Sequence, residues 1–124
     1  MENNKITSFK DLLVWQKAKD FAVLVYRITG KFPKDELYGL TSQLRRAAVS
    51  VSSNIAEGFK RSFKKEKIQF YNIALASLAE VESQIEIAKE LRFIEDKDYT
   101  ECQDFILHIN RMLQKLIMSA DNRI

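Results

Sequence analysis

Glycine, proline and cysteine are all scarce in this chain. Its 124 residues include three glycines, one proline and one cysteine. Because glycine and proline interrupt helices and mark turns, their scarcity favours long helices joined by short connections. The single cysteine, Cys102, excludes a disulfide within the chain and is typical of a reducing compartment, so we predict a cytoplasmic protein.

Long apolar segments are missing as well. The first residues, MENNKITSFKDLL, contain no apolar core of a signal peptide. The longest stretch without a charged residue, 68–79, is shorter than the roughly 20 residues that a membrane-spanning helix needs. We therefore expect neither export nor contact with a membrane.

Residues suited to catalysis or metal binding are few. The one histidine, His108, follows Asp104 by four positions, which is not the Glu-x-x-His spacing of di-iron bundles. Cys102 falls among apolar positions, where a buried, inert thiol is the usual outcome. Glu57 and Glu80 are expected to form ordinary ion pairs rather than an acid–base pair. We predict a protein that is not an enzyme and holds no cofactor or metal.

The residues that are present form four segments with apolar side chains at intervals of three and four. This spacing predicts helices over about 11–29, 36–61, 63–91 and 96–121, with Asp11 as the N-cap of the first. Connections this short favour antiparallel neighbours. We predict an all-α protein, an antiparallel up-down-up-down four-helix bundle that forms a single domain over residues 1–124.

Apolar residues also occur outside these stripes. Phe21 and Leu24 are extra on the first helix, Ile73 and Ile87 on the third, and Phe105 on the fourth. A bundle of this length buries about one stripe per helix, so part of this surplus is expected to stay outside. Excess apolar surface on a soluble chain is typical of a subunit interface, and we predict a homo-oligomer.

Charges of the two signs are concentrated in different parts of the sequence. Residues 31–67 carry nine basic and four acidic side chains, whereas residues 68–101 carry three basic and eight acidic ones. The acidic residues Glu82, Glu86 and Glu90 recur at intervals of four on the third helix. Such blocks can pair within the chain, pair between subunits, or form a basic binding face.

Six basic residues of the second and third helices form the candidate nucleic-acid-binding site. The hydroxyls of Ser50 and Ser53 follow Arg46 at helical spacing and leave room for a phosphate backbone. In the competing interpretation, the arginine pair contacts the acidic third helix instead. The six residues are Arg45, Arg46, Lys60, Arg61, Lys64 and Lys65.

Small residues dominate the second helix between the arginine pair and Gly58, which favours close packing on its neighbours. Asn54 lies beside the apolar stripe, where a buried amide needs a partner. We expect Asn54 to set packing register rather than bind a ligand, and Gly58 to permit a close approach.

Three stretches resemble a known family. They are FKDLLVWQKA at 9–18, FPKDELYGLTSQLRRAAVSVSSNIAEG at 32–58 and IALASLAE at 73–80. The chain resembles the four-helix-bundle family of ribosomal-RNA intervening-sequence proteins, and is similar to the accessory variability determinant proteins of diversity-generating retroelements. Arg45 and Arg46 match the basic pair that opens the family block, and Asn54, Glu57 and Gly58 match its close.

The resemblance implies a homopentameric ring of four-helix protomers, a basic surface that engages nucleic acid, and no enzyme activity. In the retroelement relatives it also implies a reverse transcriptase as partner. The chain departs from the family pattern at Ala76-Ser77, where Gly-Ser is common, and at Arg92-Phe93, where a glycine is common. We predict a non-enzymatic nucleic-acid-binding accessory protein; the alternative is a protein-interaction scaffold without nucleic-acid contact.

Overall fold

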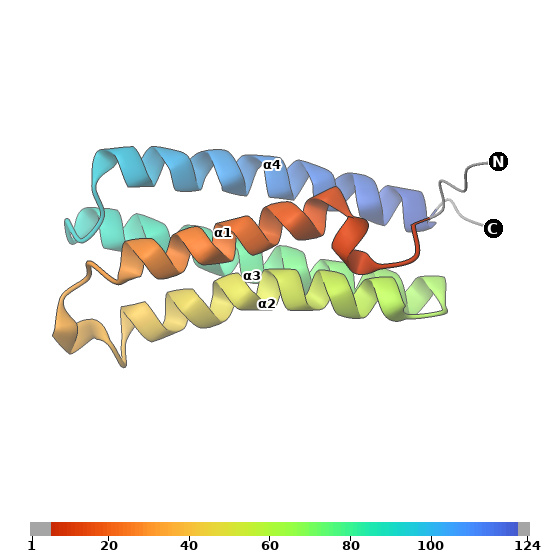
Figure 1. Cartoon of the computed structure of the whole chain (residues 1–124), viewed down its shortest axis with the longest axis horizontal. Helices are drawn as coiled ribbons and strands as arrows, with labels where there is room; N and C mark the ends of the chain where they lie inside the picture. The colour runs from red at the N-terminus through yellow and green to blue at the C-terminus, as the bar shows by residue number, and fades with distance from the viewer. Residues whose placement is uncertain (1–5, 122–124) are drawn as a thin grey trace.

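The computed structural model describes residues 6–121, and it confirms the all-α fold. Neighbouring helices lie side by side and run in opposite directions (Figure 1). Two short 3₁₀ turns, η1 (Phe9–Asp11) and η2 (Lys34–Glu36), precede the first and second helices. The four long helices are α1 (Leu13–Thr29), α2 (Leu40–Lys60), α3 (Lys64–Glu90) and α4 (Asp96–Asp121).

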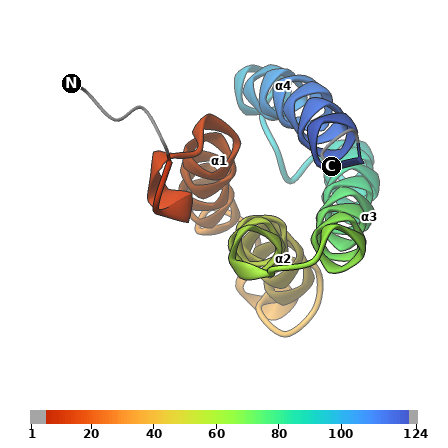
Figure 2. The same cartoon turned by 90° about the vertical axis from the view of Figure 1, so that its right-hand side faces the viewer.

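Contacts between helix ends are consistent with this up-down-up-down order. Lys31, just after α1, lies 3.5 Å from the carboxylate of Asp98 in the first turn of α4. Lys64 Nζ at the start of α3 donates to the carbonyl oxygen of Asp121 at the end of α4, at 3.3 Å. Each helix packs against its two neighbours, with α1 and α4 closing the bundle (Figure 2).

The predicted starts of α1 and α2 were too early. Asp11 ends η1, and the extended Leu12 separates this turn from α1, so Asp11 is not the N-cap. The first turn of α2 begins only at Leu40, whose N–H donates to the Glu36 carboxylate at 3.2 Å. Acidic residues are favourable at several positions near the start of a helix. Asp11 and Glu36 therefore did not show at which residue each helix begins.

Apolar residues from all four helices form one core. Part of the apolar surplus is inside: Phe21 and Leu24 are buried, and Phe105 stacks on Phe21 with ring centroids 5.5 Å apart. Ile73 and Ile87 of α3 do remain exposed. No helix within residues 6–121 combines the length and hydropathy that crossing a membrane requires.

The end of α3 explains why a glycine is common there. Arg92 has a φ of 62°, in the left-handed region. The N–H of Phe93 donates to the carbonyl oxygen of Ala88 at 2.9 Å, and this hydrogen bond caps the C-terminus of α3. A left-handed residue other than glycine costs about 1 kcal/mol, so this chain tolerates strain that glycine avoids.

Candidate nucleic-acid interface

The six candidate basic residues fall into two groups at opposite ends of the bundle. Arg45 and Arg46 lie near the start of α2, while Lys60 ends it. At about 1.5 Å per residue, roughly 20 Å of helix separates them. Arg61, Lys64 and Lys65 continue around the turn into α3 (Figure 1). The structure therefore does not bring all six into one patch on the described chain.

The second group, which we name the turn cluster, consists of Lys60, Arg61, Lys64 and Lys65. All four side chains are exposed. The side chain of Lys65 has no hydrogen bond or ion pair with residues 6–121. The side chain of Lys60 makes only a loose contact, with Nζ 5.7 Å from the ring centre of Phe9. Lys64 donates to a backbone carbonyl and keeps its net charge. Three of these four cations are therefore not neutralised within the described chain.

Arg61 is the exception in the turn cluster. Its guanidinium donates to the carboxylate of Glu57 at 3.0 Å and lies 4.5 Å from the ring centre of Phe70. Both side chains of this ion pair are exposed, so water screens it and it stabilises the fold by at most about 1 kcal/mol. A phosphate can therefore replace Glu57 as the partner of Arg61 with little loss in the free energy of unfolding.

Lys67 belongs to the same basic block of the sequence but has a structural contact. Its Nζ donates to the carbonyl oxygen of Phe59 at 2.7 Å and lies 3.3 Å from that of Gly58. These carbonyls belong to the last turn of α2, where no N–H group four residues further on continues the helix. The carbonyl of Gly58 also accepts from the N–H of Arg61 at 3.2 Å. Lys67 thus caps the C-terminus of α2, and we do not include it in the turn cluster.

Arg45 and Arg46 have different surroundings although they are adjacent. Arg45 is half-buried; its Nε donates to Thr29 Oγ1 at 2.9 Å, and its guanidinium lies 4.7 Å from the ring centre of Tyr26. Arg46 is exposed, and its side chain has no hydrogen bond or ion pair with residues 6–121. Arg45 therefore joins α2 to the end of α1, whereas Arg46 is available to a partner.

Replacing each arginine by alanine should separate these roles. Arg45→Ala is expected to lower the free energy of unfolding by about 1–3 kcal/mol, because it removes hydrogen bonds and a cation–π contact with α1. Arg46→Ala is expected to change it by less than about 0.5 kcal/mol, as at other exposed sites. Urea unfolding followed by circular dichroism measures both; equal losses would contradict the assignment.

Asn54 lies in a polar contact between α2 and α3. Its Nδ2 donates to the carbonyl oxygen of Ser50 at 2.8 Å and to Ser50 Oγ at 3.0 Å. Ser50 Oγ is also 2.8 Å from Ser77 Oγ on α3, where the family pattern has its Gly-Ser. The amide is half-buried, and this chain of bonds ties it to the helix pair rather than to a ligand cavity.

Within residues 6–121, the acidic residues of α3 do not pair with Arg45 or Arg46. Glu86 accepts hydrogen bonds from Tyr99 and from Gln103 of α4, the latter at 2.8 Å. The bond from Tyr99, which would be lost on ionisation, raises the pKa of Tyr99 above its ordinary value. Within residues 6–121, Glu82 and Glu90 form no ion pair. Pairing of the arginines with this face between subunits stays a prediction.

The side chains weighed for catalysis or metal binding do not converge. Cys102 is fully buried, and this burial raises the pKa of its thiol to about 12, so the reactive thiolate is suppressed. The ring of His108 pairs with Asp104 on the exposed face of α4, with Nδ1 3.7 Å from Oδ1. Among residues 6–121, no three His, Cys, Asp or Glu side chains are grouped as ligands of one ion.

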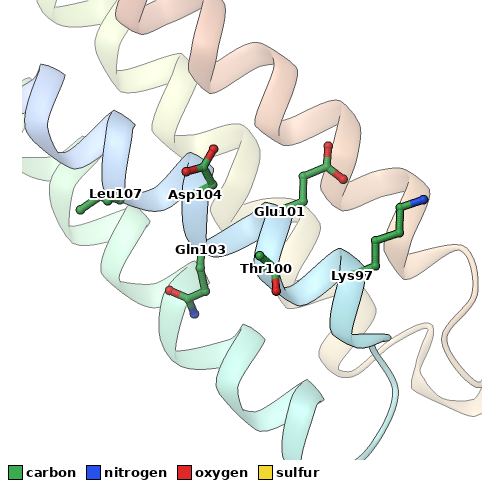
Figure 3. Close-up of a pocket in the computed structure, with 6 residues that line it drawn as sticks. All are labelled: Lys97, Thr100, Glu101, Gln103, Asp104 and Leu107. Atoms are coloured by element: carbon green, nitrogen blue, oxygen red, sulfur yellow. The ribbon is translucent and has the colours of Figure 1, made fainter.

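The surface hollows include one along the first half of α4 and one at the start of α2. The first, of about 660 Å³, runs along α4 between Lys97 and Leu107; its lining side chains all come from this helix and spread in different directions (Figure 3). It is an open groove without converging polar groups.

The second hollow, of about 380 Å³, is lined by Tyr26 of α1 and by Tyr38, Arg45 and Arg46. The sequence interpretation missed both tyrosines, although an aromatic residue in the polar PKDELYG turn was a usable signal.

Comparison with known proteins gives a match to a family model and matches to solved structures. The family model described as 23S rRNA-intervening sequence protein matches residues 10–115. The fold is similar to the crystal structure of a protein with unknown function from the S23 ribosomal protein family of Bacteroides thetaiotaomicron. The two chains share 24% identity over 85% of this chain and 98% of that one, with a TM-score of 0.76. No curated protein matches the sequence at a significant level.

Proposed function

Because the chain belongs to the family of 23S rRNA-intervening sequence proteins, we propose that it is a non-enzymatic, homo-oligomeric accessory protein that binds structured RNA or DNA. The observation that carries the proposal is the turn cluster, where four exposed cations surround one connection between helices. Lysine and arginine at this density are typical contacts to the phosphate backbone, which give affinity without sequence readout.

Exposed apolar side chains support the oligomeric part of this proposal. Leu13, Phe63 and Met118 are 70%, 69% and 62% exposed, and all three lie at the end of the bundle that carries the turn cluster. Burying them against other copies removes apolar area from water. The resemblance to pentameric relatives makes five copies our proposed number, and a ring would repeat the turn cluster in every subunit.

Salt dependence is the direct test of phosphate binding. We expect a structured RNA and a matched DNA duplex to bind at low salt, with log affinity falling linearly as log salt concentration rises. A slope of about −3 to −4 corresponds to the four cations of one turn cluster, and a steeper slope to several subunits. Fluorescence anisotropy gives the affinities, and analytical ultracentrifugation in the same buffers gives the oligomer mass.

The alternative function is a protein-interaction scaffold. It is favoured by the acidic face of α3, which no basic residue covers within residues 6–121, and by the exposed Ile73 and Ile87 on the same helix. In that case a stable oligomer forms but neither RNA nor DNA binds at low salt. A reverse transcriptase as partner, implied by the resemblance to retroelement proteins, stays a prediction under either function.

A further inference from the structure

The hollow between the end of α1 and the start of α2 has a distinct chemical character. Its floor and walls come from Tyr26 on α1, from Leu37 and Tyr38 before α2, and from Ser42, Arg45 and Arg46 on α2. Its volume of about 380 Å³ falls in the lower part of the range for small-ligand sites, roughly 300 to 1,000 Å³. The turn cluster is at the other end of α2, so this is a separate surface.

Two aromatic rings border this hollow without being buried by the fold. Tyr38 is 93% exposed and Tyr26 is 47% exposed. A ring as exposed as that of Tyr38 contributes almost nothing to the core and leaves both faces open to a flat partner. Tyr26 is held in place because Arg45 stacks on its ring and donates toward its carbonyl oxygen at 3.4 Å.

The positive charge of the hollow favours an anionic ligand. Arg45 and Arg46 both line it, and no carboxylate does. Arg45 is fixed by its bond to Thr29, so it supplies a stationary positive charge. Arg46 is exposed and has no polar partner within residues 6–121, so its guanidinium keeps all its donors for a ligand. A hydroxyl at Ser42 adds a neutral hydrogen-bonding group.

We infer that this hollow binds one unpaired nucleotide of a single-stranded segment, and the inference rests on the proposed function. The base stacks on Tyr38, and the adjoining phosphate accepts hydrogen bonds from Arg46. A nucleotide offers a planar base beside a phosphate. The open ring of Tyr38 can stack on the base while the free guanidinium of Arg46 binds the phosphate. The turn cluster would hold duplex or folded nucleic acid by charge, while this site would select strands whose bases are not paired.

Binding of a labelled oligothymidine of about ten nucleotides and of a matched DNA duplex, at one fixed low salt concentration, tests the inference. Tyr38→Ala is expected to weaken single-strand binding about 5- to 100-fold, and Tyr38→Phe to leave it unchanged, because the ring and not the hydroxyl stacks. Arg46→Gln should weaken it about 5-fold or more. Arg111→Gln on α4 is the charge-matched control.

The possible results separate this inference from the proposed function. Selective loss of single-strand binding in Tyr38→Ala, with duplex affinity and oligomer mass preserved, supports the nucleotide site. Full single-strand binding by a folded Tyr38→Ala variant overturns the site while leaving duplex binding by the turn cluster intact. A change in oligomer mass in Tyr38→Ala or Arg46→Gln assigns the hollow to a subunit contact and overturns the inference. Absence of all binding in the unmodified protein overturns both.

Discussion

Reversing the charges of the turn cluster, by changing Lys60, Arg61, Lys64 and Lys65 to glutamate, should weaken nucleic-acid binding at least about 100-fold at low salt. Each reversal removes an attractive contact to phosphate and adds a repulsive one. The loss should be equal for RNA and DNA of different sequences, because phosphate contacts carry no base information. The slope of log affinity against log salt concentration should become shallower by up to about four. Anisotropy titrations over a salt series measure both effects.

A second quadruple variant controls for the change in overall charge. Four other exposed cations have side chains without a hydrogen bond or ion pair within residues 6–121: Arg27, Lys34, Lys97 and Arg111. Their replacement by glutamate changes the net charge by the same amount at other places on the bundle. Equal weakening by both variants would show a general effect of charge and not a site. Undiminished binding by a folded turn-cluster variant would reject the site outright.

The variant Gly58→Ala should lower the free energy of unfolding by about 1–2 kcal/mol. A Cβ atom at this position would lie 2.5 and 2.8 Å from two ring carbons of Tyr71, and 3.2 Å from the carbonyl oxygen of Lys67. Carbon atoms normally approach to about 3.5–4 Å, and the Tyr71 ring is buried in the core between the helices. The strain of such overpacking exceeds the gain of about 1 kcal/mol in helix propensity from glycine to alanine.

Gly30→Ala is the matched control in the same chain. The nearest atom to a Cβ at Gly30 is the carbonyl oxygen of Arg27 at 3.4 Å, an ordinary contact, and the φ of −62° suits any residue. This variant should be neutral or stabilising by up to about 1 kcal/mol. In combination with Tyr71→Leu, the penalty of Gly58→Ala should shrink, because the clashing ring is gone. A Gly58→Ala protein as stable as Gly30→Ala would show that α2 and α3 do not pack so closely.

Local patterns in the sequence were enough for the class of fold and for most helix ends. The three-and-four spacing of apolar residues reports which face of each helix is buried, and the stretch from Asp96 to Asp121 becomes a helix with the predicted bounds. The first turns of α1 and α2 were misplaced, because Asp11 and Glu36 are equally acceptable in a short 3₁₀ turn before the helix. Such a choice depends on contacts across the turn, which spacing does not report.

Residue types and their spacing are sufficient to show that this chain forms helices, that it carries a basic block, and that it contains few residues for metal or covalent chemistry. How each charge is used depends on the packing of the helices. Arg45, Arg46 and Lys67 look alike in sequence, yet Arg45 bonds to Thr29, Lys67 caps α2, and Arg46 stays exposed. The reason is physical: what a flexible cation contacts depends on which carbonyls and rings the folded chain places within its reach.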